Sequence, residues 1–346
     1  MLHFIVYTKF FEKSSMEELG RCGKFKVVKK HINYMVIDAT KGFLKKLGKS
    51  KPVFVYGAAA IESHGPISES AYLQSIYRTL AKAGIPRSRG IRIECIEINS
   101  KRGYSSKDLE VYLGKRLEKE GVKVDIVRPK EMFFIVLLDM HCYVGRSSDL
   151  RIARLLNPLR YPYSNGISRA EQKLKEAIEY FGIGTSGVAV DIGAAPGGWS
   201  YVLANRGMKV IAIDNGDLDA AKLKAHKVSV LMLRKGGSAS RALSRCDILH
   251  VKASASRAAS MLDLKAVDMV VDDTNIRAKD SAAAAMSYSR FMRSGATLIM
   301  TVKCVTRKVD KYMNEASEVL GREFEIRGVK ALPSNRQEVM LYAVRK

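Results

Sequence analysis

The stretch that decides the fold is Val188-Ala-Val-Asp-Ile-Gly-Ala-Ala-Pro-Gly-Gly-Trp199. Apolar residues of strand length end at Asp191, a loop of small residues follows, and a helix is predicted to begin near the tryptophan. Small residues let a ligand approach the backbone closely at the carboxyl end of a first strand. A second predicted strand, Val210–Ile213, ends at Asp214, whose carboxylate can accept hydrogen bonds from ribose hydroxyls. The stretch therefore predicts a nucleotide-like cofactor.

The loop differs from one that binds a pyrophosphate. Its spacing is not GxGxxG, and Pro196 removes an N–H that a phosphate cradle would use. A cofactor with a nucleoside but no phosphates fits better, and S-adenosylmethionine is such a molecule. We expect it to be bound by the ends of the two strands and the loop between them, namely Asp191, Gly193, Ala195, Pro196, Gly197, Gly198, Trp199 and Asp214.

The sequence around this loop alternates strands and helices. Ser168-Arg-Ala-Glu171 has the pattern of a capping box, and the helix that it opens is predicted to stop at Gly182. Further strands are predicted at Met269–Val271 and Thr297–Val302, with a helix at Ser281–Met292 between them. Such alternation predicts an α/β fold with a doubly wound parallel sheet, which we place at residues 167–346.

The N-terminal half has a different pattern, with short strands and few helices. Helices are expected within 65–84 and after Ser105-Ser106, and strands at Phe4–Thr8, Lys24–Lys29, Tyr34–Ile37, Ile91–Ile98, Val122–Val127, Phe133–Leu138 and Cys142–Gly145. Ile91–Ile98 alternates apolar and polar residues, as a half-buried strand should. We predict an α+β region with a first segment at 1–50, a module at 51–148 and a linker at 149–166.

Composition narrows the class of protein. The chain of 346 residues suggests two or three domains, and a net charge of +24 favours a polyanionic partner, with nucleic acid first and an acidic membrane surface second. The five scattered cysteines show no metal-ligand spacing and no disulfide framework. No apolar run reaches the length of a membrane span, and no signal peptide is visible. We expect a soluble cytoplasmic protein.

The cofactor loop and four residues after the linker resemble the FtsJ family of ribose 2′-O-methyltransferases, from Ser168 to the C-terminus. The resemblance implies a Rossmann-like methyltransferase fold and a Lys-Asp-Lys-Glu catalytic tetrad. The matching positions are Lys173 in Ser168-Arg-Ala-Glu-Gln-Lys173, Asp273 with Asp272 as a close competitor, Lys303 at the end of a strand, and Glu338 at the start of the last strand. It also implies that Ser168 and Asp273 contact the cofactor.

The chemistry implied for these residues needs no metal, because the sulfonium is already a good leaving group. Lys303 is the expected general base and must be neutral to accept the hydroxyl proton. Asp273 and Glu338 would raise its pKa, whereas Lys173, the cofactor charge and burial would lower it. The family usually has an acidic residue after the third strand, near the adenine. The matching stretch here, Val228–Gly237 or Ile248–Ala255, ends in no acid.

The region Arg89–Arg146 resembles a THUMP domain through Arg89-Gly-Ile-Arg-Ile, Tyr104-Ser-Ser106, Val122-Lys-Val-Asp-Ile-Val-Arg-Pro129 and Tyr143-Val-Gly145. The resemblance implies binding of structured RNA, rRNA or tRNA, with a ferredoxin-like segment in front. The layout is also similar to that of bacterial large-subunit ribosomal RNA cytidine ribose methyltransferases. Basic residues that could contact phosphates are Lys101, Arg102, Lys107, Lys115 and Arg116.

Two other functions stay open. One is methylation of an RNA base, although the place of an amino-methylating Asn/Asp-Pro-Pro-Tyr motif reads Asp272-Asp273-Thr274-Asn275. Carbon methylation would need a cysteine nucleophile, for which Cys304 is the candidate. The other function is RNA binding without catalysis, against which the complete tetrad argues.

Overall fold

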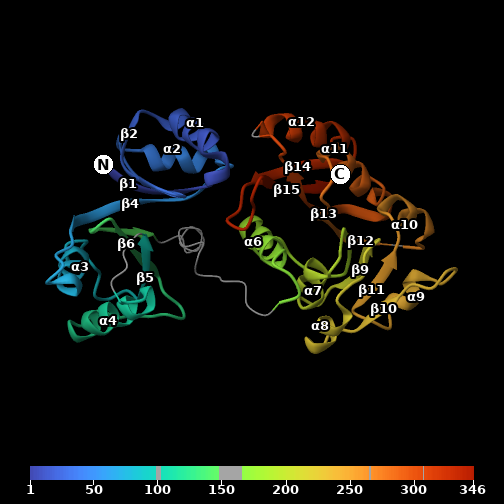
Figure 1. The fold of residues 1–346 in the computed structure, drawn as a ribbon, viewed down its shortest axis with the longest axis horizontal. Helices are drawn as coiled ribbons and strands as arrows, with labels where there is room; N and C mark the ends of the chain where they lie inside the picture. Colours follow the sequence, from blue (N-terminus) through green and yellow to red (C-terminus); the bar gives the residue numbers. More distant parts are fainter. Residues whose placement is uncertain (99–102, 148–165, 265, 307) are drawn as a thin grey trace. The chain divides into compact units, whose positions relative to one another are not determined.

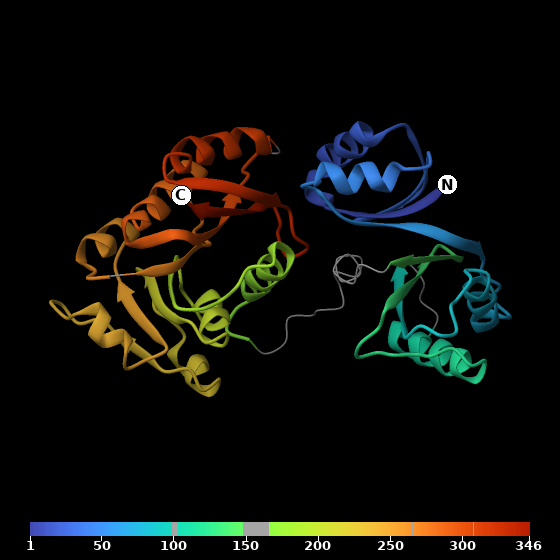
Figure 2. The same ribbon diagram turned by 180° about the vertical axis from the view of Figure 1, so that it is seen from behind.

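The computed structural model describes residues 1–98, 103–147, 166–264, 266–306 and 308–346. The predicted linker 149–166 lies, apart from Gly166, outside these ranges. The chain forms two compact units, Met1–Arg160 and Tyr161–Lys346. Each described unit is built on its own sheet, of seven strands in the first and eight in the second (Figures 1 and 2).

The first part of the N-terminal unit follows a β-α-β-β-α-β order. Its strands lie side by side as β2-β3-β1-β4, and every neighbouring pair is antiparallel. This is the ferredoxin-like arrangement, and it runs past residue 50 because its fourth strand is β4. The elements are β1 (Leu2–Tyr7), α1 (Glu12–Cys22), β2 (Phe25–His31), β3 (Tyr34–Ala39), α2 (Phe43–Ser50) and β4 (Val55–Pro66).

Strand β4 is long enough to continue into the second part of this unit, where it pairs with β7 and so joins seven strands into one sheet. Helix α4 starts at a capping box in which Ser105 Oγ accepts from the Asp108 amide and the Asp108 carboxylate accepts from the Ser105 amide. The elements here are α3 (Tyr72–Ala81), β5 (Ile91–Ile98), α4 (Ser106–Lys119), β6 (Glu131–Leu138) and β7 (His141–Ser147).

Two expectations for this part were wrong. Residues 122–127 form no strand, because only Val124 bridges to Ile91 before the chain turns away. The Asp125 carboxylate accepts from the amides of Val127 and Arg128, and this local turn competes with further pairing. The strand Ile91–Ile98 is present as predicted, but it is covered on both faces, so that even Glu94 is buried.

The C-terminal unit holds a sheet in the order β10-β11-β9-β8-β12-β13-β15-β14. The first six strands are parallel, and β15 runs antiparallel to both neighbours. Helices cover both faces, with Leu174, Val202 and Leu223 of α6, α7 and α8 in one core (Figure 1). The predicted alternation of strands and helices is confirmed. The strands are β8 (Val188–Ile192), β9 (Lys209–Asp214), β10 (Val230–Met232), β11 (Ile248–Lys252), β12 (Val267–Asp272), β13 (Met292–Lys303), β14 (Phe324–Lys330) and β15 (Glu338–Arg345).

The helices of this unit differ from the prediction at one place. The helix expected at Ser281–Met292 is α11 at Ala278–Met286, and Met292 instead begins β13. The alanines of α11 favour a helix, but the chain leaves the helix after Met286 and forms a short 3-10 turn at Ser289–Phe291 before the strand. The helices are α6 (Glu171–Phe181), α7 (Gly198–Ala204), α8 (Ala220–Ala225), α9 (Ala239–Leu243), α10 (Ala255–Met261), α11 and α12 (Val309–Leu320).

Two further features are the state of the cysteines and the length and apolarity of the helices. All five cysteines are buried and free. No helix in the described ranges combines the length and apolarity that a bilayer crossing requires.

Candidate active site

The residues singled out in the sequence gather at one edge of the C-terminal sheet. Strands β8, β9, β12 and β13 are parallel, so their carboxyl ends meet there. Strand β15 is antiparallel and begins at the same edge, where Glu338 is the direct register partner of Lys303. In the order β9-β8-β12, the chain leaves β8 toward one side of the sheet and later returns to its other side at β12. Open α/β sheets bind ligands at such a point, outside the carboxyl ends of the strands.

The loop after β8 is shaped by glycines. Gly193 has a φ of +75°, and a Cβ added there would lie 2.6 Å from Thr274 Cγ2 and 3.2 Å from the Thr274 amide nitrogen. Only glycine suits this position, because it needs both the left-handed backbone and the missing side chain. Gly197, with a φ of +112°, precedes the first residue of α7, Gly198. The loop backbone is therefore held close to the end of β12.

Asp214 closes the loop from the neighbouring strand. Its Oδ2 accepts from the Ala195 amide at 3.0 Å, and its Oδ1 accepts from the Gly216 amide at 2.7 Å. Pro196 contributes no donor, but its carbonyl accepts from the Asp219 amide. The carboxylate thus orders the loop and keeps acceptor capacity on both oxygens.

The start of α6 packs against the loop. The Trp199 indole is buried and donates to the Ala170 carbonyl at 2.8 Å. The predicted capping box forms only by half: the Glu171 carboxylate accepts from the Ser168 amide at 3.2 Å, but Ser168 Oγ makes no cap bond. Within the described ranges this buried hydroxyl has no hydrogen-bond partner, and a Cβ at Gly198 would lie 2.1 Å from it. An orphaned hydroxyl beside a glycine cradle is the kind of site that fits a small polar ligand.

Asp191 lies under the loop at full burial, and its Oδ2 accepts from Ser200 Oγ at 2.6 Å. The pKa of this carboxyl is raised to about 7. Burial is the largest cause, the hydrogen bond from Ser200 lowers the pKa, and the charges of Asp273 and Asp272 raise it. Asp191 therefore ties the end of β8 to α7 through Ser200.

The four tetrad positions meet in space. Lys303 Nζ lies 3.0 Å from Asp273 Oδ1 and 2.5 Å from Glu338 Oε2. Lys173 Nζ lies 3.1 Å from both oxygens of Asp273 and 2.7 Å from Glu338 Oε1. Each amine thus contacts both carboxylates, in a ring of two positive and two negative groups. All four side chains are no more than 17% exposed, so water screens the ring weakly.

A family model matches most of the C-terminal unit. Residues 167–323 match the family model described as FtsJ-like methyltransferase. The C-terminal unit carries an FtsJ-like methyltransferase domain. The match includes Lys173, Asp273 and Lys303, and Glu338 follows it.

Individual relatives match about half of the chain. Proteins named ribosomal RNA large subunit methyltransferase M are 30% identical in Pseudomonas entomophila, over 43% of this chain and 46% of that protein, and 30% identical in Shewanella denitrificans, over 49% and 50%. An uncharacterized protein of Methanocaldococcus jannaschii is 28% identical over 46% of this chain and 40% of its own. The chain therefore spans half or less of these relatives. Among solved structures, TrmN from Thermus thermophilus covers all of both chains with a TM-score of 0.39 and 14% identity.

The ion pairs of the ring in the FtsJ-like domain shift the pKa values of Lys303 and Glu338. Burial lowers the pKa of Lys303, but the charges and hydrogen bonds of Asp273 and Glu338 outweigh burial and raise that pKa above its usual value. Burial raises the pKa of Glu338, and the two lysines outweigh it, so this carboxyl has a pKa below its usual value. Of the influences weighed in the sequence, the carboxylates dominate, and Lys303 is an ammonium at neutral pH.

The two neighbouring aspartates of the FtsJ-like domain have different partners. Asp272 is fully buried, and its oxygens accept from the Thr274 amide at 2.7 Å and from Ser281 Oγ at 2.7 Å. It ties the end of β12 to α11. Asp273 points to both lysines instead. The structure thus brings Asp273, and not Asp272, into the ring.

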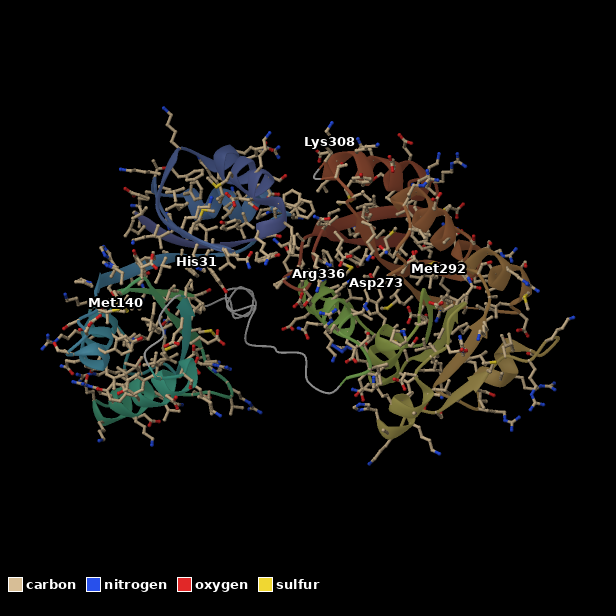
Figure 3. All side chains as sticks on the ribbon, viewed as in Figure 1. His31, Met140, Asp273, Met292, Lys308 and Arg336 are labelled. Atoms are coloured by element: carbon tan, nitrogen blue, oxygen red, sulfur yellow. The ribbon has the colours of Figure 1, made fainter. Side chains whose placement is uncertain are left out.

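Four residues near the ring were not anticipated from the sequence. Thr301 Oγ1 donates to Asp273 Oδ1 at 2.9 Å, and the period-2 spacing from Lys303 along β13 could have indicated it. The others, Glu176, Ser334 and Asn335, link α6 to the turn before β15. No local pattern signals such a link. Figure 3 labels Asp273 and the exposed Arg336 of this turn.

Cys304 is poorly suited to nucleophilic chemistry. It is buried, its Sγ donates to the Val302 carbonyl, and burial, with the nearby Glu338 charge, raises the pKa of the thiol to about 12. A thiolate is the nucleophilic form of cysteine. This environment therefore disfavours the carbon-methylating alternative.

The third strand is β11, because it lies next to β9, whereas residues of the stretch Val228–Gly237 form the edge strand β10. Strand β11 ends at Lys252, whose Nζ lies 2.7 Å from Asp217 Oδ1 in the loop after β9. The acid that the family usually has after this strand is absent from the sequence. A carboxylate from the preceding loop lies beside its end.

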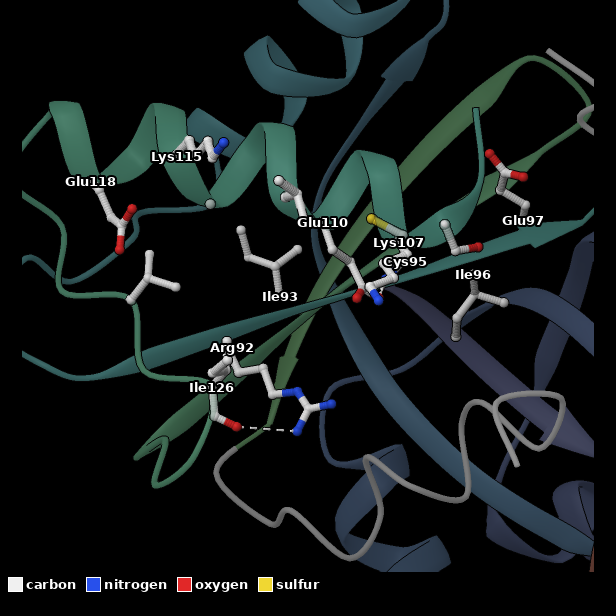
Figure 4. A pocket seen from close by; sticks show the side chains of 14 residues that line it. Arg92, Ile93, Cys95, Ile96, Glu97, Lys107, Glu110, Lys115, Glu118 and Ile126 are labelled. Carbon is white, nitrogen blue, oxygen red and sulfur yellow. Dashed lines mark hydrogen bonds between the residues drawn. The ribbon is translucent and has the colours of Figure 1, made fainter. Parts of the chain in front are cut away.

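The basic residues proposed for the N-terminal unit have mixed surroundings. Lys107 and Lys115 line a groove of about 760 Å³ between β5 and α4, together with Glu97, Glu110 and Glu118 (Figure 4). Arg116 stacks over the Tyr77 ring at 3.7 Å and donates to Gln74, so it holds α4 against α3. Lys101 and Arg102 lie outside the described residues.

Proposed function

We propose that this protein transfers a methyl group from S-adenosylmethionine to a ribose 2′-hydroxyl of a structured RNA, rRNA or tRNA. The observation that carries the proposal is the meeting of Lys173, Asp273, Lys303 and Glu338 beside the glycine-rich loop of an FtsJ-like domain. The relatives named as ribosomal RNA methyltransferases and the net charge of +24 support RNA as the substrate.

The residues present at the loop fit the cofactor. Gly193 and Gly198 leave the space in which a side chain would collide. Ser168 offers a buried hydroxyl with no partner among the described residues, and Asp214 keeps acceptor capacity for ribose hydroxyls. Within the proposal, Asp191, Ala195, Pro196 and Gly197 shape the loop. When bound, the cofactor supplies an electrophilic methyl group on a sulfonium.

The four ring residues accept the proton and position the reacting groups. Lys303 accepts the proton of the 2′-hydroxyl as the oxygen becomes the nucleophile. Asp273 holds Lys303 in place and lies at the cofactor end of the ring. Lys173 and Glu338 orient the ribose and the lysine, so that much of the rate enhancement comes from positioning.

A pH dependence follows from the raised pKa of Lys303. Because the base must be neutral, and its ammonium form dominates below that pKa, the rate should rise about tenfold per pH unit from pH 7 to pH 9. The measurement is kcat/KM under single-turnover conditions with subsaturating RNA. A flat profile, with RNA affinity constant over the same range, would rule out Lys303 as the base.

Three exposed cations are candidates for contacts to RNA at the same sheet edge. Arg277 follows β12, Lys308 follows β13, and Arg336 lies in the turn before β15. They therefore lie in the loops next to the strands that carry Asp273, Lys303 and Glu338. In the proposal the N-terminal unit, with a THUMP domain at 51–148 that shares β4 with the ferredoxin-like part, adds further phosphate contacts through Lys107 and Lys115.

The affinity for RNA should fall steeply with salt, since phosphate contacts release counterions. Replacing Arg277, Lys308 or Arg336 with Ala should each lower the slope of log K against log salt by about 1. Arg206→Ala is the matched control, because this exposed residue precedes β9 at the opposite edge. Fluorescence anisotropy with labelled rRNA fragments from low to moderate salt measures the slopes. Affinity that does not change with salt would count against binding through phosphates.

The proposed function is tested by a single-turnover assay with labelled cofactor, followed by nuclease digestion and nucleoside analysis. Label on a 2′-O-methyl nucleoside supports it. Label on a base identifies the protein as a base methyltransferase. RNA binding without any transfer identifies a binding module.

A further inference from the structure

A carboxylate of α6 grips the turn that leads to Glu338. Glu176 lies one helical turn after Lys173, and its Oε2 accepts from the Ser334 amide at 3.0 Å. Its Oε1 accepts from Ser334 Oγ at 2.8 Å and from Gln172 Nε2 at 3.3 Å. The two residues are 158 positions apart in the chain. The contact therefore joins the element that carries Lys173 to the one that carries Glu338.

The turn continues this link to the ring. Asn335 is 2% exposed, and its Oδ1 accepts from the Leu332 amide at 2.8 Å. Its Nδ2 donates to Glu338 Oε1 at 3.3 Å, the same oxygen that lies 2.7 Å from Lys173 Nζ. A path of hydrogen bonds thus runs from Glu176 through the Ser334–Asn335 turn to the carboxylate between the two lysines.

We infer that Glu176 and Ser334 form a clasp that positions Glu338 against Lys173 and Lys303. The inference rests on the proposed function and names two positioning residues for it. Glu338 is the first residue of β15, so the sheet holds it from one side only, and the turn before it decides where its carboxylate lies. Fixing that turn to α6 keeps both amines in contact with both carboxylates.

The polar partners of Glu176 indicate that the clasp has a role beyond packing, since its half-buried carboxylate accepts from both donors of Ser334. Burial raises the pKa of its carboxyl, and the Ser334 and Gln172 hydrogen bonds only partly offset this. A half-buried carboxylate loses part of its hydration, so its place here depends on the hydrogen bonds that it accepts from Ser334 and Gln172. The two-oxygen acceptor is suited to hold both donors of Ser334 at once.

The test compares Glu176→Ala, Glu176→Gln and Glu179→Ala, where Glu179 is an exposed carboxylate on the same helix. Glutamine keeps the grip, because its oxygen accepts from the Ser334 amide while its NH2 donates to Ser334 Oγ. We expect Glu176→Ala to lower the single-turnover rate about 10- to 100-fold, since small misplacements are costly. Glu176→Gln and Glu179→Ala should stay within about threefold of the wild type by the same argument.

A second measurement does not depend on activity. Competitive acetylation at several pH values, analysed by mass spectrometry, reports the pKa of the Lys303 amine. It should fall in Glu176→Ala, because Glu338 moves away, and stay at the wild-type value in Glu176→Gln. The affinity for S-adenosylhomocysteine should change by less than about twofold in all variants, because the glycine-rich loop is untouched.

The outcomes separate the clasp from the proposed function. An unchanged Lys303 titration in Glu176→Ala, or equal damage from Glu176→Gln, overturns the clasp. A wild-type protein that methylates no ribose overturns the proposed function, and the titration then decides the clasp alone. If Glu176→Ala does not fold, Ser334→Ala gives the same test, because it removes one of the two clasp donors.

Discussion

Replacing Lys303 with Arg is expected to slow methyl transfer by about 10²- to 10⁴-fold, which is the usual contribution of a general base. Arginine keeps the positive charge that Asp273 and Glu338 require, so the ring should persist and the protein should fold. A guanidinium cannot give up its proton in this pH range, so it cannot accept one from the ribose. The measurement is the single-turnover rate with saturating cofactor and RNA.

The control for this change is Lys311→Arg, which makes the same substitution at an exposed site on α12. Its rate should equal that of the wild type. Lys303→Ala should be as slow as Lys303→Arg while still binding S-adenosylhomocysteine and RNA. Undiminished transfer by either Lys303 variant would remove this lysine from the role of base.

Among substitutions that add one methyl group to the cofactor loop, Gly193→Ala should reduce the stability of the protein most. A left-handed backbone costs alanine about 1–2 kcal/mol, and overpacking adds about 1–3 kcal/mol. The added Cβ would meet both the side chain and the backbone of Thr274, and backbone cannot swing aside. We expect about 2–5 kcal/mol of lost stability in urea unfolding, as the sum of these two costs. The affinity for S-adenosylhomocysteine should also fall.

Gly207→Ala separates the two causes. Gly207 has a φ of +85° in the turn after α7, but no atom lies within 4 Å of an added Cβ. It should lose only about 1–2 kcal/mol, from the backbone, and keep its affinity for the cofactor product. Equal losses at the two glycines would mean that close contact with Thr274 does not constrain the loop.

Parts of the structure that depend on neighbours in the chain were predicted well. Strand β8, Val188–Ile192, lies where the apolar run up to Asp191 predicted it, and Gly182 ends α6 in a left-handed conformation with a φ of +65°. Errors occurred where two local patterns competed or where partners were distant. Asp125 turned residues 122–127 away from β5, and Ser168 lacked the cap bond that its spacing suggested.

The sequence alone determined the candidate residues of the site. Motifs of neighbouring residues and the predicted ends of strands were enough to propose the glycine-rich loop, Lys173, Lys303 and Glu338. It left two matters open: whether Asp272 or Asp273 joins the lysines, and whether Lys303 carries a charge.

Only the tertiary structure decided these matters. Asp273 contacts the amines because the chain turns after β12 while Asp272 is bonded to Ser281. Lys303 keeps its charge in spite of burial because Asp273 lies beside it and because β15, antiparallel to β13, brings Glu338 to its other side. The clasp of Glu176 and Ser334 is likewise invisible along the chain. Strand order and register set these contacts, and hydrogen bonds between residues so far apart leave no local pattern.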